Sequence, residues 1–471
     1  MGKGSQSASL FISMEKLFAQ NLKNRVLVTP ATKILLAVSA GLDSMVMLTL
    51  FRHIQDQFAL EIAVGHVNHQ LRSDAEKDVT FLREYCLTHN LEFYLENVDV
   101  KEAVLNSDES MEMSARRMRY EALKRIKTEA RADLIATAHT ASDQAETVLL
   151  RILEGTGVKG LQGIRVKRND IIRPLLDFDR SAIEEYARIH NVPYRKDVTN
   201  QDLDIKRNRI RHELLPQIRQ HINPNVNSAL NRFSSIQSEV HELLEDSGHR
   251  AFEEALLEQS ADQIILDLGK CQTYFTAILK TLFINCLAEL GVPTHSLTFS
   301  QMEQLTHLVK AGKSGAQVTL PGDVIVMKDR KQLLFSRGKP WSEFSAPFTV
   351  GEFNHGSYRW QVTEQSAEQL STLKNSEPWT EFFDKVRIEM LNPYWRNWQD
   401  GDSMIIPGGM TKKVSDIFVD AKLPVWEKHR RPLLVTEKKD VLWIPGIKRS
   451  AEAWITEKTK GIIQITVTKV I

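Results

Sequence analysis

Short apolar runs alternate with helix-like patterns through the first 215 or so residues. Three of the runs have the length of buried strands: residues 34–38, 62–67 and 134–138. A helical spacing of apolar positions follows the first run and again covers residues 143–153 after the third. Strands that alternate with helices predict an α/β fold, a doubly wound parallel sheet with helices on both faces. Ligands of such sheets lie beyond the carboxyl ends of the strands, the edge that holds Ser39, His66 and His139.

The pattern changes at Leu214-Leu-Pro216, which predicts a helix stop. Helical patterns with few turns then extend to Gly312, and residues 273–290 predict a buried helix. Short strands separated by turns follow over residues 317–336, and strands mix with short helices after about Phe382. We therefore expect three domains: the α/β domain in residues 1–217, a mainly helical domain in 218–340, and a boundary region with a small mixed α+β domain in 341–471.

Composition narrows the class of protein. With 61 Lys and Arg against 60 Asp and Glu among 471 residues, the net charge of +1 excludes a histone-like polycation. The 42% of hydrophobic residues excludes wholesale disorder, and no apolar run approaches the roughly 18 residues that a membrane span needs. Residues 1–13 lack the pattern of a signal peptide. The three cysteines are far apart and form no metal or disulfide pattern, which predicts reduced thiols in a cytoplasmic protein: Cys86, Cys271 and Cys286.

Positive charge gathers in the last domain. Residues 410–450 hold ten basic and five acidic residues, with Trp426 and Trp443 among them. A basic module that contains aromatic residues suits contact with RNA, although an ordinary soluble surface explains the composition about equally well. The basic residues that we select as candidates for RNA contact are Lys412, Lys413, Arg430 and Arg431.

The segment Ser39-Ala40-Gly41-Leu42-Asp43-Ser44 is the sharpest chemical feature. It lies between a buried strand and a helix, where small residues let the backbone wrap an anion and the helix amides stabilise phosphate charge. Asp43 at a phosphate site makes sense if it holds a metal ion or polarises a reactant. An ordinary strand-to-helix turn is the alternative, and the surrounding motifs favour phosphate binding.

A second group follows the third strand. His139 ends this strand, and Asp143 and Glu146 lie on one face near the start of the next helix. A capping box with Ser142 or Asp143 as the cap would explain one acid, but not the histidine beside two acids. His66 and Asn68 end the second strand and are expected to line a nucleotide pocket.

Arginines add two further clusters. Arg116 belongs to a basic helical group with Tyr120, and Arg207 and Arg211 open a basic helix after a polar loop. A guanidinium can grip a phosphate or a carboxylate through two hydrogen bonds. These arginines are therefore candidates for binding phosphate, RNA or a substrate carboxylate.

Together these motifs resemble the tRNA(Ile)-lysidine synthetase family of PP-loop ATP pyrophosphatases. The similarity is ordered and covers most of the chain, although the middle region matches mainly by length and helical character. Ala40 departs from the usual Gly of the loop, and Ser142 stands where many relatives have a second Asp. The matching segments are residues 39–44, 66–72, 112–120, 138–157, 173–176, 197–200, 207–211, 401–402, 412–418 and 442–446.

The resemblance implies a ligase that modifies the wobble cytidine of an isoleucine tRNA with a CAU anticodon. ATP would adenylate the cytidine, with release of pyrophosphate, and L-lysine would displace AMP to form lysidine. It implies that residues 39–44, His66 and Asn68 bind ATP and that Asp43 places Mg²⁺. The implied catalytic residues are Asp43, Asp143 and His139, and the implied lysine-binding residues are Asp143, Glu146 and Arg116. The implied tRNA contacts are Arg207, Arg211, Lys412, Lys413, Arg430 and Arg431.

Two alternatives stay open. Another PP-loop enzyme, such as a tRNA thiolase or an amide-forming synthetase, would share the loop, but a thiolase would need a cysteine pair that this sequence lacks. A non-catalytic tRNA-binding relative would have a nucleotide loop disabled by Ala40. A homodimer that spans one tRNA is compatible with each of these interpretations.

Overall fold

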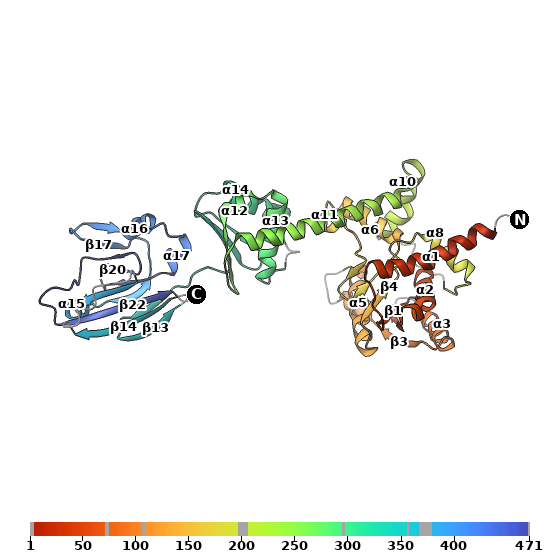
Figure 1. The fold of residues 1–471 in the computed structure, drawn as a ribbon, viewed down its shortest axis with the longest axis horizontal. Helices are drawn as coiled ribbons and strands as arrows, with labels where there is room; N and C mark the ends of the chain where they lie inside the picture. Colours follow the sequence, from red (N-terminus) through yellow and green to blue (C-terminus); the bar gives the residue numbers. More distant parts are fainter. Residues whose placement is uncertain are drawn as a thin grey trace. The chain divides into compact units, whose positions relative to one another are not determined.

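The computed structural model describes residues 4–70, 75–105, 110–195, 206–293, 297–355, 358–366 and 379–469 (Figure 1). The chain divides into two compact units, residues 1–242 and 243–471. This division falls inside a long helix, so the domain boundaries expected after residues 217 and 340 stay predictions. Among the helices of the described residues, none combines the length and the hydropathy that a membrane span requires.

A six-stranded sheet forms the centre of the first unit, in the order β3-β2-β1-β4-β6-β5. All neighbours are parallel except β5 and β6, and the three strands expected from the sequence are the central ones, β2, β1 and β4. The strands are β1 (Lys33–Ala37), β2 (Glu61–Asn68), β3 (Glu92–Asn97), β4 (Leu134–Thr137), β5 (Lys167–Arg168) and β6 (Ile171–Ile172). The doubly wound fold is confirmed, and the strand order changes direction between β1 and β4. Such a switch point opens a crevice for ligands at the carboxyl ends of the two strands.

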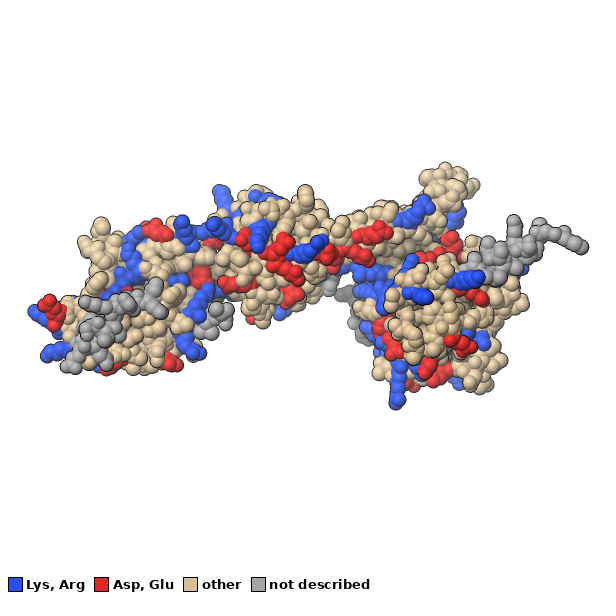
Figure 2. All heavy atoms as spheres, viewed as in Figure 1, with Lys and Arg blue, Asp and Glu red and all other residues tan. Residues whose placement is uncertain are grey.

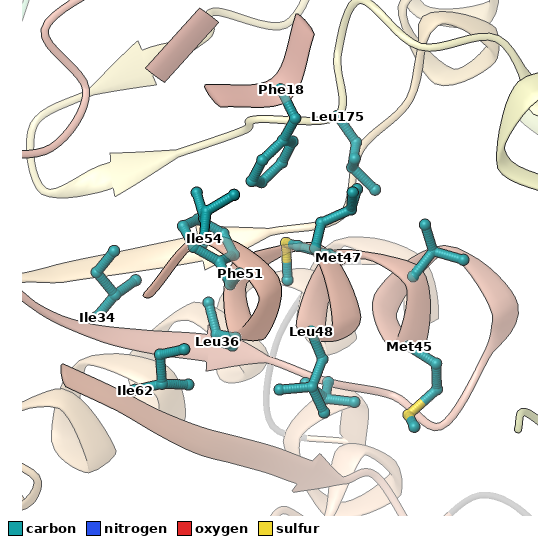
Figure 3. Packing of buried hydrophobic residues seen from close by; sticks show 14 of the residues in the cluster. Phe18, Ile34, Leu36, Met45, Met47, Leu48, Phe51, Ile54, Ile62 and Leu175 are labelled. Atoms are coloured by element: carbon teal, nitrogen blue, oxygen red, sulfur yellow. The ribbon is translucent and has the colours of Figure 1, made fainter. Parts of the chain in front are cut away.

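Helices cover both faces of this sheet, and alternate side chains of β1 pack against each layer. Ile34 and Leu36 join the core under α1, α2 and α8, where Phe18 and Phe51 meet (Figure 3). Leu35 points to the opposite face and packs with residues of α5. The helices of this unit are α1 (Gly4–Asn24), α2 (Leu42–Phe58), α3 (Ala75–Thr88), α4 (Val100–Leu105), α5 (Met111–Glu129), α6 (Ala141–Leu153), α7 (Val158–Leu161), α8 (Arg180–Ile189), α9 (Lys206–Arg209) and α10 (Leu215–His221).

The helix stop expected at Pro216 is wrong. A π-helical turn, Ile210–Leu214, joins α9 to α10, and the N–H of Leu215 bonds the carbonyl of Ile210. Pro216 stands in the first turn of α10, directly after the π-helical turn, and the preceding Leu214 is itself helical. The helical run therefore continues through the proline, and the chain goes on into α11 (Val226–Ala255), which crosses from the first unit into the second.

The middle part of the second unit combines helices with a five-stranded sheet in the order β7-β8-β11-β10-β9. The buried helix and the short strands expected from the sequence are confirmed as α13 and β9 to β11. The sequence analysis missed β7 and β8, because it predicted helices with few turns up to Gly312. The elements are β7 (Leu256–Gln259), β8 (Gln263–Asp267), α12 (Leu268–Thr273), α13 (Thr276–Glu289), α14 (Phe299–Ala311), β9 (Gln317–Leu320), β10 (Val324–Asp329) and β11 (Gln332–Arg337).

The last part of the chain is the expected mixed α+β domain. Its two larger sheets, β12-β16-β19-β20-β21 and β13-β14-β22-β15, enclose the buried rings of Trp360, Trp395 and Trp443. All eight tryptophans of the chain lie in residues 341–471. The elements are β12 (Ser345–Pro347), β13 (Gly351–His355), β14 (Tyr358–Ser366), β15 (Thr380–Asp384), α15 (Lys385–Met390), β16 (Tyr394–Asn397), β17 (Ser403–Ile405), β18 (Thr411–Lys413), α16 (Val414–Asp420), α17 (Val425–Arg430), β19 (Pro432–Val435), β20 (Val441–Ile444), β21 (Lys448–Arg449) and β22 (Gly461–Lys469).

The connection from β1 to α2 holds Ala40 in the left-handed region, with φ of +65°. Its side chain is fully buried, and its carbonyl accepts a hydrogen bond from the N–H of Arg195 at 2.9 Å. A Cβ in this backbone conformation crowds the following carbonyl, at a strain of about 1 kcal/mol that glycine avoids. The fold therefore accommodates the alanine in a strained but well-packed turn.

Replacing Ala40 with glycine should relieve this strain. We expect Ala40→Gly to raise the free energy of unfolding of the first unit by about 1 kcal/mol, and Ala40→Val to lower it. Urea denaturation followed by far-ultraviolet circular dichroism measures the change. Tryptophan fluorescence, which reports only residues 341–471, should show the same transition in all three proteins. A glycine variant less stable than the parent chain would contradict the expectation.

Candidate active site

The Ser39–Ser44 loop is shaped by its two serines. The hydroxyl of Ser44 accepts a hydrogen bond from the N–H of Ser39 at 3.1 Å and donates one to the carbonyl of Gly41 at 2.9 Å. Gly41 is the N-cap residue of α2 and has no side chain that could accept from the first amides of the helix. These amides are therefore available to an anion, at the positive end of the helix dipole.

The predicted nucleotide residues of β2 flank this loop. The Nδ1 atom of His66 lies 2.8 Å from the carbonyl oxygen of Val38, the residue before the loop. The side-chain amide of Asn68 donates to Glu76 at 3.1 Å, and its oxygen accepts from the N–H of Gln70. Both side chains are buried, so these bonds fix the edge of the sheet beside the loop. Their contact with ATP stays a prediction.

Asp43, in the first turn of α2, pairs with an arginine that the sequence did not single out. The Nη1 atom of Arg180 lies 2.8 and 2.9 Å from the two carboxylate oxygens. Burial raises the pKa of Asp43 and outweighs the opposing charge of Arg180. Arg180 is the first residue of α8, 137 positions away, and no local pattern pairs it with the loop.

Asp143 and Glu146 form a four-residue network with Arg207 and Arg211. Glu146 accepts from Arg207 Nε at 3.0 Å and from Arg211 Nε at 2.6 Å. One oxygen of Asp143 accepts from both guanidinium groups, at 3.1 and 3.0 Å. The Glu146 side chain is only 3% exposed, so its charge depends on these partners. The structure thus joins residues predicted to bind lysine to residues predicted to bind tRNA, and the four charges cancel.

The start of α6 explains the position of Asp143. The N-cap residue is Thr140, neither Ser142 nor Asp143, and Asp143 completes the capping box by accepting from the Thr140 N–H at 2.9 Å. Burial alone would raise the pKa of Asp143, but Arg207, this N–H and Arg211 together hold the pKa below its usual range. Asp143 is therefore a carboxylate at neutral pH. It accepts the capping hydrogen bond of α6 and also pairs with the two arginines.

His139 and Arg116 occupy different surroundings. Burial, reinforced by the charges of Arg173 and Arg119 and opposed by Asp143, lowers the pKa of His139 to about 3, so its ring is neutral at pH 7. Its Nδ1 atom lies 2.9 Å from the hydroxyl of Thr137. Arg116 is exposed on α5, with its guanidinium 5.5 Å from the centre of the Tyr120 ring. Its contact with lysine stays a prediction.

The four candidates in the last domain differ in exposure. Lys413 is exposed at the end of β18, whereas Lys412 is half-buried and pairs with Asp420. Arg430 donates to the carbonyl of Pro340 at 2.6 Å and to Gln263. Charges of both signs are interspersed over the face shown in Figure 2. RNA contact stays a prediction for these residues.

Arg431 requires a correction to its expected role. It is only 6% exposed, donates to the carbonyl of Pro445 at 2.5 Å and lies 4.8 Å from the centre of the Trp379 ring. A guanidinium held in this way inside the domain supports its fold and offers little surface to RNA. The matching segments at Leu71-Arg72 and Asp197–Asn200 lie outside the described residues.

Comparison with known proteins decides the family. Residues 13–218 match the family model of the PP-loop domain, and residues 394–466 match that of the TilS substrate C-terminal domain. The tRNA(Ile)-lysidine synthase of Clostridioides difficile (strain 630) is 30% identical over 455 residues, which cover 94% of this chain and 97% of the relative. The chain belongs to the tRNA(Ile)-lysidine synthase family.

Other members of the tRNA(Ile)-lysidine synthase family match over a similar length. The protein from Clostridium perfringens (strain ATCC 13124) is 29% identical, over 96% of this chain and 99% of the relative. That from Thermotoga maritima is 30% identical, over 88% of this chain and 92% of the relative. The PP-loop match spans the Ser39–Ser44 loop and the four-residue network, so the site lies within the ATP-binding domain of the family.

Removing the charge of Glu146 should show how much the network stabilises the unit. We expect Glu146→Gln to lower the free energy of unfolding by about 3 kcal/mol, because two guanidinium groups lose a buried partner. Urea denaturation followed by circular dichroism measures the loss. Glu154→Gln, at the other end of α6 and in an exposed pair with Arg151, should change it by less than about 1 kcal/mol. Equal effects of the two substitutions would contradict a special role for the network.

Proposed function

We propose that this chain attaches L-lysine to carbon 2 of the wobble cytidine in the CAU anticodon of isoleucine tRNA. The reaction consumes ATP and releases pyrophosphate and AMP. The observation that carries the proposal is the match to tRNA(Ile)-lysidine synthases over 94% of the chain, which includes both the PP-loop domain and the C-terminal domain. The two acids beside the loop supply the site that an amine substrate needs.

The first step requires a site for ATP. The carbonyl oxygen at carbon 2 of cytosine is a poor leaving group, and its attack on the α-phosphate of ATP converts it into an adenylate while pyrophosphate leaves. The free amides of α2 would hold the departing phosphates. A partly buried carboxylate in a phosphate loop is a hard oxygen donor that fits Mg²⁺, so Asp43 would hold that ion once Arg180 releases it. The bound ion would neutralise charge on the pyrophosphate.

The second step requires lysine with a free amine. The side-chain amine has a reference pKa of about 10.4, so only ~1 in 2,500 molecules is neutral at pH 7. Asp143 and Glu146 would bind the ammonium group and then accept or relay its proton. His139, neutral at pH 7, could accept a hydrogen bond there, and AMP would leave as the amine attacks carbon 2.

The network implies that tRNA or ATP binds before lysine. With Arg207 and Arg211 in place, the two acids carry no net charge to attract an ammonium group. Both arginines lie in short helical segments, and their side chains are 24% and 34% exposed, within reach of an incoming polyanion. Phosphates of tRNA or ATP would draw the arginines away and leave the acids to lysine.

The alternatives are weaker in this structure. The three cysteines are buried, and burial raises the pKa of Cys86 to about 11 and that of Cys271 to about 12, unlike the reactive thiolates of a thiolase. Ala40 adopts the required left-handed backbone and remains packed, so it does not disrupt the loop. A cytoplasmic location and a homodimer complete the proposal, and light scattering of the purified chain would measure its assembly.

An assay of the complete reaction tests the function. The purified chain is incubated with ATP, Mg²⁺, labelled L-lysine and the CAU isoleucine tRNA, and the digested RNA is searched for labelled nucleoside. We expect label in the wobble nucleoside. If pyrophosphate release depends on tRNA but no labelled nucleoside forms, the result would support the adenylating site and contradict lysine as the nucleophile. Binding of tRNA with neither product would favour the non-catalytic relative.

Asp43 should be required for adenylation. We expect Asp43→Asn to slow tRNA-dependent pyrophosphate release by about 100-fold or more, because charge stabilisation at the phosphates is lost. Asp56→Asn, an exposed acid at the other end of α2, is the matched control and should leave the rate unchanged. A similar rate for both variants would remove Asp43 from the mechanism.

Lysine binding should depend on the polyanion. In equilibrium dialysis with labelled lysine, we expect affinity at least about tenfold higher when tRNA and a non-hydrolysable ATP analogue are present. Arg211→Ala should raise the affinity of the chain alone, whereas Arg219→Ala, on the exposed side of α10, should not. Equal affinity with and without the polyanions would contradict the proposed order.

Substitutions of Lys413 and Arg431 should have different effects: the first should change tRNA binding and the second the stability of the last domain. Lys413→Ala should weaken tRNA binding and lower its salt dependence by about one ion, while the exposed Lys16→Ala serves as a control. Arg431→Ala should instead lower the stability of the last domain by about 2 kcal/mol, because it leaves a buried carbonyl unpaired. Filter binding and tryptophan fluorescence in urea measure the two effects. Lost binding without lost stability in Arg431→Ala would restore its predicted RNA role.

A further inference from the structure

A second cluster of ligand-type side chains lies in the first unit, outside the active site. Glu15 of α1, His53 of α2 and His190 at the end of α8 each offer one atom, and these three atoms all lie within 4.8 Å of one another. His53 is ten residues beyond Asp43 on the same helix, a distance of about 15 Å along its axis. The cluster is therefore separate from the phosphate loop.

The atoms of the cluster converge on one carboxylate oxygen. Glu15 Oε1 lies 2.8 Å from Nδ1 of His53 and 3.9 Å from Nε2 of His190. The side chains of all three are partly exposed, so an ion could enter from solvent.

A buried tyrosine orients these groups. The hydroxyl of Tyr186 donates to Glu15 Oε1 at 3.1 Å and lies 3.0 Å from Nδ1 of His53. Its ring stacks on His190, with 4.2 Å between the ring centres. Tyr186 is 1% exposed and cannot shift easily. The stacked ring holds the His190 imidazole in position, as supporting contacts do for the ligands of metal sites. On binding of an ion, the Tyr186 hydroxyl would turn away from Oε1 and Nδ1, because these atoms would then bind the metal.

We propose that Glu15, His53 and His190 bind a Zn²⁺ ion. Two imidazoles and one carboxylate form a common zinc donor set, with bonds of about 2.0–2.2 Å, and water would fill the fourth position. Tetrahedral ligands at such bond lengths are about 3.4 Å apart, between the two distances from Glu15 Oε1 to the histidines. Magnesium and calcium prefer sites made only of oxygen, so the nitrogen donors select a transition metal.

The ion would fasten three helices that are distant in the sequence. Glu15 and His190 are 175 positions apart, and α1 otherwise contacts this face of the sheet through core residues such as Phe18. A metal that binds the folded arrangement and not the unfolded chain stabilises the fold. The site would therefore be structural and would secure α1 against α2 and α8.

Zinc titration of the full chain tests the proposal. The protein is stripped with a chelator and titrated with ZnCl₂ in the presence of excess Mg²⁺, which occupies oxygen-only sites. We expect one tight Zn²⁺ per chain and a higher Tm with zinc. His53→Gln and His190→Gln should each weaken binding by about tenfold or more and abolish the rise in Tm. His249→Gln, an exposed histidine on α11, is the matched control and should bind like the parent chain.

Cobalt gives an independent spectroscopic measurement. Co²⁺ in place of zinc should show the intense visible absorption of a four-coordinate site, and His190→Gln should lose it. Circular dichroism checks that each variant folds, and Glu15→Gln replaces His53→Gln if that variant does not. The absence of a stoichiometric tight site, or unchanged zinc affinity in the folded variants, would overturn the proposal.

Discussion

The ion pairs between Asp143 and Glu146 of α6 and Arg207 and Arg211 of the following helical segment are the constraint on which the active site depends. They bring together groups more than 60 positions apart and give a nearly buried glutamate two charged hydrogen-bond donors at the edge of the sheet. Because the two carboxylates pair with two guanidinium groups, the four charged side chains together carry no net charge. In the proposed mechanism, lysine binds when the two acids exchange their arginine partners for its ammonium group.

The same exchange applies on the other side of the crevice. Asp43 is held by Arg180 in the way that the α6 acids are held by their arginines. The site thus contains two sets of ion pairs, and in the proposed mechanism a phosphate opens each of them by binding the guanidinium group. ATP and a nucleic acid both carry phosphates, so the substrates of this family supply the anions that these arginines can bind.

Local patterns in the sequence predicted much of this architecture. The apolar runs gave the central strands β1, β2 and β4, and the small residues after β1 indicated the turn into α2. The pairing of Asp43 with Arg180 could not be predicted, because it depends on how α8 packs and not on any neighbouring residue. Counting basic residues also failed to distinguish Lys413, which is exposed, from Arg431, whose guanidinium is enclosed by Pro445 and Trp379.

The distribution of tryptophan has a consequence for observing the molecule at work. The first unit, residues 1–242, contains the phosphate loop and the paired acids but no tryptophan. The indole rings therefore report on residues 341–471 and, through Trp341 and Trp426, on the residues of β8, β10 and β11 that they contact. If tryptophan fluorescence changes when a small substrate binds the Ser39–Ser44 loop, the change must reflect a conformational effect in the second unit. The tryptophans are therefore a natural probe of coupling between the two units.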